Sequence, residues 1–136
     1  MLTPWFLVKL YSLSAVLFLA VDLVWIGTVA SSFYQKQLGH LLRDQPLRVP
    51  ALIFYAIYIF GVLVFAVLPG LEAESLKRSA ALGALLGLLA YATFDLTAMA
   101  ILKDFPLAVV LVDLAWGVVL TGSVAAAGFG IGRWLL

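Results

Sequence analysis

Residues 10–30 read LYSLSAVLFLAVDLVWIGTVA, an apolar stretch that a single charged side chain, Asp22, interrupts. About 20 apolar residues are enough to cross the hydrocarbon core of a bilayer as a helix. Three further apolar stretches of similar length follow. Of the 136 residues, 65% are apolar and 11% are charged, whereas soluble domains average about 45–50% and about 25%. The composition predicts an integral membrane protein.

The four apolar stretches predict an all-α, four-helix transmembrane bundle with short loops and both termini on the same side of the membrane. We expect one integral membrane domain, residues 1–136, with spans at about residues 5–32, 50–68, 79–102 and 106–133. Thr3-Pro4, Pro50 and Pro106 are typical helix starts, and Pro69-Gly70 predicts a helix end.

The segment 33–49 mixes basic residues with leucines and predicts an interfacial turn or short helix. Trp5, Trp134, Phe33 and Tyr34 fit an aromatic belt at the membrane surface. Lys and Arg are equally divided between the two sides, so the charge bias predicts no orientation. The net charge is only +1 and there is no cysteine, so the sequence indicates neither a nucleic-acid partner nor a disulfide framework.

Three aspartates lie inside the apolar stretches: Asp22, Asp95 and Asp113. An acid at bilayer depth costs roughly 2.5–3.5 kcal/mol, which makes it a functional-site candidate. Two of these acids open near-copies of one motif, Asp22-Leu-Val-Trp25 and Asp113-Leu-Ala-Trp116. These acids are therefore the best guide to function.

Counting from the loops assigns a depth to each acid. Asp95 lies eight residues before Lys103, Asp113 eight after Phe105, and Asp22 eight before the expected span end at Ala30. At ~1.5 Å rise per residue, all three would lie ~12 Å below one membrane face. Tyr58, eight residues after Pro50, falls at the same depth. The counts predict one layer of acids, which Trp25 and Trp116 would flank from opposite sides because their spans run antiparallel.

Helical spacing predicts how two spans pack. Gly83, Gly87, Tyr91 and Asp95 recur every four residues and share one helix face. The GxxxG pair favours close approach of a neighbouring helix. Asp113, Gly117 and Thr121 form the corresponding face of the last span, and we expect the two faces to meet. The expected hydrogen-bond donors around the acids are Tyr55, Tyr58, Tyr91, Thr97 and Thr121.

No lysine or arginine shares the predicted layer, so three carboxylates in low dielectric cannot all be ionised. Three functions remain open: a proton-linked site for a lipid-like or cationic ligand, with or without transport; a lipid-modifying enzyme that uses paired aspartates; or an accessory subunit whose acids only join helices. The ligand site is preferred to the enzyme. We expect no metal, because no histidine lies in the layer, and no cofactor. The glycine faces also suggest a homodimer.

Several motifs resemble a known family. They include Asp22-Leu-Val-Trp25-Ile-Gly27, Leu38-Gly39-His40-Leu41-Leu42, Gly87 through Thr97, and Val112 through Gly117. Together they resemble the bacterial predicted membrane proteins catalogued as domain of unknown function 2177. The resemblance implies a multi-pass protein of the bacterial inner (cytoplasmic) membrane, with four helices and no assigned activity. Genes of that family often lie beside genes for cyclopropane-type fatty-acid modification, which implies membrane lipid and lipid-metabolism proteins as partners.

Overall fold

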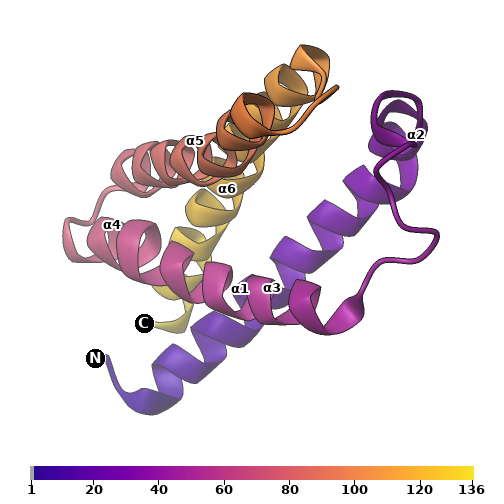
Figure 1. Ribbon diagram of the computed structural model, residues 1–136. Helices are drawn as coiled ribbons and strands as arrows, with labels where there is room; N and C mark the ends of the chain where they lie inside the picture. Colours follow the sequence, from indigo (N-terminus) through magenta and orange to yellow (C-terminus); the bar gives the residue numbers. More distant parts are fainter. Residues whose placement is uncertain (1) are drawn as a thin grey trace.

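The structure is a computed structural model that describes residues 2–136, and in that range all its regular secondary structure is helical (Figure 1). Its elements are α1 (Pro4–Val24), η1 (Trp25–Ala30), α2 (Ser31–Leu38), α3 (Arg48–Val62), η2 (Leu63–Val67), α4 (Leu68–Glu72), α5 (Leu76–Ile101) and α6 (Leu107–Leu135), where η marks a π-helical segment. The first three elements form one continuous helix, and so do the next three. Four helices are therefore long and apolar enough to span a membrane, which confirms the predicted fold class.

Local sequence signals explain the start of two of these helices. The Thr3 hydroxyl accepts a hydrogen bond from the Phe6 amide at 3.0 Å, and Pro4 occupies the first turn. The Ser75 hydroxyl caps α5 in the same way, by accepting from the Arg78 amide at 3.1 Å. Each side chain replaces a partner that the first helical amides lack. The predicted helix start at Thr3-Pro4 is confirmed.

The first helix is longer than predicted. It continues through Leu38, and only residues 39–47 form a loop, so the expected end near residue 32 is wrong. The segment 33–49 is consequently not a separate interfacial element. Phe33, Tyr34 and Leu38 pack against a small core at the α5–α6 turn, and this packing supports the extra helical turns. The core consists of Ala98, Phe105, Val109 and Val110.

The second helix also passes its predicted end, because Pro69-Gly70 lies inside it. The Leu68 amide bonds the carbonyl of Leu63, five residues back, within the π-helical segment η2. This wider turn precedes Pro69, which has no N–H to donate, and lets the helix continue. Gly70 is needed for a different reason: a Cβ there would collide with the Ser79 side chain of α5. The Ser79 hydroxyl in turn donates to the Ala66 carbonyl of η2 at 2.9 Å.

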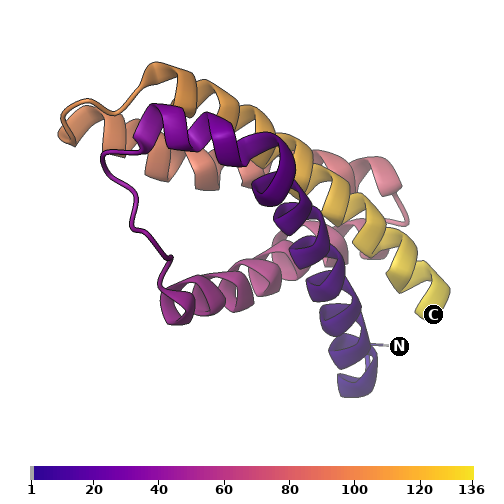
Figure 2. The same cartoon turned by 90° about the vertical axis from the view of Figure 1, so that its right-hand side faces the viewer.

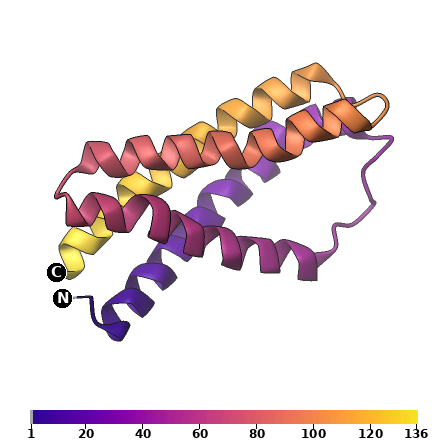
Figure 3. The same cartoon turned by 60° about the vertical axis from the view of Figure 1, so that its left-hand side comes forward.

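Helices α5 and α6 form a tight antiparallel hairpin (Figures 1 and 3). A Cβ on Gly83 would lie 2.5 Å from the Ala125 Cβ, and one on Gly87 would collide with the Gly117 carbonyl oxygen. Only glycine allows these two backbones to lie so close. The predicted small-residue faces are therefore the ones at which these two helices meet.

In contrast to the two hairpin helices, α3 diverges from α5 toward its own N-terminal end (Figure 3). Helix α2 lies along the hairpin, and the loop 39–47 crosses between α2 and α3 (Figures 2 and 3). The start of α1 and the end of α6 lie at the same end of the bundle (Figure 3). The main core fills the crossing of α1, α3, η2 and α6 and includes Phe18, Tyr58, Val62, Ala66 and Leu120.

Candidate functional site

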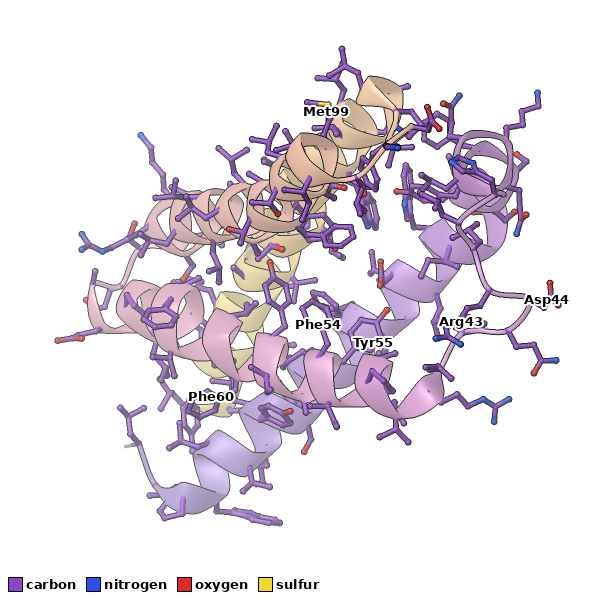
Figure 4. All side chains as sticks on the ribbon, viewed as in Figure 1. Arg43, Asp44, Phe54, Tyr55, Phe60 and Met99 are labelled. Carbon is purple, nitrogen blue, oxygen red and sulfur yellow. The ribbon has the colours of Figure 1, made fainter. Side chains whose placement is uncertain are left out.

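Asp22, on α1, is held by two side chains from other helices. It is buried, with 7% of its surface exposed. The Tyr55 hydroxyl of α3 donates to one carboxyl oxygen at 2.5 Å, and the Trp116 indole N–H of α6 donates to the other at 3.2 Å. Figure 4 shows Tyr55 projecting from α3 toward the inside of the bundle. We call Asp22, Tyr55 and Trp116 the Asp22 cluster. Both carboxyl oxygens of Asp22 have a hydrogen-bond donor in it.

Asp113, on α6, has a partner that the sequence did not suggest. The hydroxyl of Tyr34, on α2, donates to the Asp113 carboxyl. The predicted place of Tyr34 in the aromatic belt depends on a first span that ends near residue 32. Because the helix runs through Leu38, Tyr34 is instead half-buried against the α5–α6 hairpin. The apolar residue spacing gave no hint of this, and only the packing of α2 on the hairpin shows it.

Asp95, on α5, has no hydrogen-bond donor in the part of the chain that the structure describes. It is fully buried, and both of its carboxyl oxygens lack a partner. The neighbouring polar group is the Asp113 carboxyl. Figure 4 shows the charged side chains Arg43 and Asp44 on the loop 39–47, outside the helices. Among the described residues, Asp95 and Asp113 thus form a carboxyl pair with one tyrosine donor and no ion pair to a lysine or arginine.

The acids do not form a single layer, and Trp25 and Trp116 do not flank them. The two indoles stack on each other, with centroids 4.3 Å apart and planes 8° from parallel. Because each indole lies three residues after its aspartate on antiparallel helices, stacking puts Asp22 and Asp113 on opposite sides of the indole pair. The Asp22 cluster is one level, and the Asp95–Asp113 pair is another.

The longer first helix explains this error in depth. Asp22 lies sixteen residues before the helix end at Leu38, or roughly 24 Å of helix. Asp95 lies six residues before the end of α5, and Asp113 lies six residues after the start of α6, or roughly 9 Å in each case. Asp22 is therefore deeper than the other two acids. Counting from Ala30 placed it too close to the membrane surface.

Three predicted site tyrosines occupy distinct positions. Tyr55 contacts Asp22, as described above. Tyr58 is within hydrogen-bond distance of Thr121 at 2.8 Å, so its partner is a hydroxyl and not an acid. The Tyr91 ring covers Gly117, and its phenol lies within electrostatic range of both Asp22 and Asp113. Tyr91 thus lies near both levels of acids, and no hydrogen bond joins it to either of them in the described residues.

Thr97 is not brought to the site. It lies exposed on α5, and its hydroxyl donates to carbonyls of its own helix, that of Phe94 at 3.0 Å and that of Thr93. Such bonds satisfy a threonine that faces lipid. Figure 4 likewise shows Phe60 and Met99 on outer faces of the bundle. The expectation that Thr97 would support the acids is therefore wrong.

An apolar groove lies beside the stacked tryptophans. Its volume is about 410 Å³. Seven residues line it: Ala20, Val21, Val24, Trp25, Thr28, Val29 and Trp116. None of the three acids reaches its surface. Within residues 2–136, no group of three His, Asp or Glu side chains could hold a metal ion.

These features define a class: a polytopic, all-helical membrane protein with carboxyl–phenol contacts buried between its spans. The comparison with known families gives the particular group. A family model described as "Predicted membrane protein (DUF2177)" matches residues 7–130, and the chain belongs to that family. Searches of curated proteins and of solved structures found no match.

Proposed function

We propose that this membrane protein binds a cationic, lipid-soluble ligand at the Asp95–Asp113 pair and releases a proton when it does so. The observation that carries the proposal is the state of Asp95. Its carboxyl is fully buried, neither oxygen has a donor among the described residues, and the group beside it is the Asp113 carboxyl. Buried polar groups in native proteins are almost always paired, so two adjacent acceptors call for a proton or a cation between them.

A negative charge at Asp95 would be strongly unfavourable without compensation. An isolated ionised carboxylate in low dielectric costs many kcal/mol, and the group accepts a proton instead. The neighbouring Asp113 carboxyl adds like-charge repulsion. Two adjacent carboxyls of this kind can hold one proton between them. A cation that replaced this proton would satisfy both acids, and binding would then be coupled to proton release.

A structural role is the second candidate function, and the Asp22 cluster favours it. Asp22 joins α1 to α3 and α6 through two hydrogen bonds and has no free oxygen. Bonds of this kind hold membrane helices together. The same explanation does not account for Asp95, because the group beside it is a second carboxyl, Asp113, and two carboxyls can bond only through a shared proton. An enzymatic role has no comparable support, because no acid lines the groove.

The test measures protons released by purified protein in weakly buffered detergent solution after addition of tetraphenylphosphonium. We expect the wild-type protein to release protons, and the Asp95→Asn and Asp113→Asn variants to release none. Asp104→Asn is the matched control: Asp104 lies in the α5–α6 turn with φ 60°, a conformation that asparagine also tolerates. Failure of the folded wild-type protein to release protons would refute the proposal.

A further inference from the structure

The groove beside the tryptophans presents an apolar surface at bilayer depth. Its one polar lining side chain, Thr28, donates its hydroxyl to the Val24 carbonyl of its own helix at 2.5 Å. The groove residues Ala20, Val24 and Val29 are exposed on the outer face of the first helix. A volume of about 410 Å³ falls within the range of small-molecule sites, roughly 300–1,000 Å³. A molecule dissolved in the hydrocarbon core can therefore reach it.

The two stacked indoles connect this groove with both levels of acids. Trp25 and Trp116 line the groove. The Trp116 N–H donates to Asp22. The Trp25 indole lies near the Tyr34 hydroxyl, which itself donates to Asp113. Each indole therefore has contact with the groove and with a residue of the acid site.

Trp25 is held less firmly than Trp116. Its indole N–H is buried and lies near the Tyr34 hydroxyl, but it has no partner at full hydrogen-bond geometry among the described residues. It is also the first residue of η1, a π-helical segment. Short π-helical segments within α-helices occur often at functional sites. Of the two indoles, Trp25 is thus the one that can turn away at the smaller cost, because Trp116 would lose its bond to Asp22.

We infer that Trp25 and Trp116 form a gate between the lipid-facing groove and the Asp95–Asp113 pair, and that the ligand is an amphipathic organic cation. This inference rests on the proposed function. The apolar body of such a cation fits the groove, and indole faces attract its charge. The two acids, which have no counter-cation, then supply the complementary charge. A small hydrophilic ion lacks the apolar body that the groove would bind.

The test follows the stacked indole pair directly, in a protein that contains no other tryptophan. Trp5 and Trp134 are exposed, so Trp5→Phe and Trp134→Phe can be introduced together. Two indoles stacked at 4.3 Å should give an exciton couplet in circular dichroism that is lost in Trp25→Phe. We expect saturating tetraphenylphosphonium to remove the couplet. A couplet unchanged by the ligand while protons are released would overturn the gate and leave the proposed function intact.

A second variant tests the groove without altering an indole or an acid. Ala20→Phe fills the groove, and Ala100→Phe, on an exposed position of α5, is its control. We expect Ala20→Phe alone to lose proton release at a concentration of tetraphenylphosphonium that half-saturates the wild type. Equal release by both variants contradicts the groove as the route. If brominated phospholipid quenches the two indoles and tetraphenylphosphonium does not relieve the quenching, the occupant is lipid and the inference is wrong.

Discussion

The α5–α6 hairpin and the α1–α3 contact join membrane helices by different means. In the hairpin, Gly87 and Gly117 lie opposite each other, and the two backbones touch. Between α1 and α3, tyrosine hydroxyls reach across instead, from Tyr11 to the Ala56 carbonyl at 2.9 Å and from Tyr55 to Asp22 at 2.5 Å. The hairpin depends on the absence of side chains, whereas the α1–α3 contact depends on two long polar ones. Asp95 lies on the hairpin but takes part in neither kind of contact.

The largest expected effect is on the hairpin. Gly87→Ala would drive a Cβ into the Gly117 carbonyl, and we expect it to destabilise the protein by about 3 kcal/mol, as overpacking does. Gly130→Ala is the control on α6, because a Cβ there meets nothing within 4 Å. The control should be neutral or stabilising by up to about 1 kcal/mol, since alanine is the better helix former. Unfolding in mixed micelles measures both; similar values for the two variants would show that the close approach is unimportant.

The next comparison sets one buried acid against another. Asp22→Leu leaves the Tyr55 hydroxyl and the Trp116 N–H without acceptors, which should cost about 2 kcal/mol of unfolding free energy. Asp95→Leu removes a carboxyl that has no donor, and we expect it to be neutral or stabilising. The same unfolding assay applies. A loss of stability in Asp95→Leu equal to that in Asp22→Leu would assign both acids a structural role.

Tyrosine-to-phenylalanine changes measure how much each hydrogen bond between α1 and α3 contributes to stability. Tyr55→Phe removes a donor from the buried Asp22 and should destabilise the protein by about 1 kcal/mol. Tyr11→Phe removes an exposed bond to a carbonyl, for which we expect about 0.5 kcal/mol, near the average for hydrogen bonds between membrane helices. Double-mutant cycles with Asp22→Asn should show coupling for Tyr55 only. Coupling between Tyr11 and Asp22 would contradict this assignment.

The smallest expected effect concerns two threonines. Thr97→Val removes a hydroxyl that bonds only its own helix, so stability should change by less than about 0.5 kcal/mol. Thr121→Val removes the buried partner of Tyr58 and should cost about 1 kcal/mol. The two values come from the same unfolding measurement. If Thr97→Val is the more harmful change, the outward orientation of Thr97 is wrong.

The helices could be read from the sequence more accurately than the site. Long apolar stretches and the Thr3-Pro4 cap predicted four spanning helices, and the Gly83 and Gly87 spacing predicted the face that meets α6. The errors in the positions of the acids come from the helix ends, whereas the orientation of Thr97 is a separate error. A π-helical turn lets the second helix continue past Pro69, and packing on the hairpin supports the first helix past residue 32. That continuation moved Tyr34 to Asp113, and the underestimated length of the first helix made Asp22 seem level with the other acids.

Hydropathy and helix length depend only on local composition. The sequence alone was therefore enough to predict four spanning helices with three acids inside them. It did not determine which partner each acid meets. Only the tertiary structure, in which α2 packs on the hairpin and Trp25 stacks on Trp116, gives Asp22 and Asp113 their donors and leaves Asp95 with none. A hydrogen bond needs two groups within about 3 Å, and an error of about two turns in one helix end, roughly 10 Å, exceeds that distance several-fold.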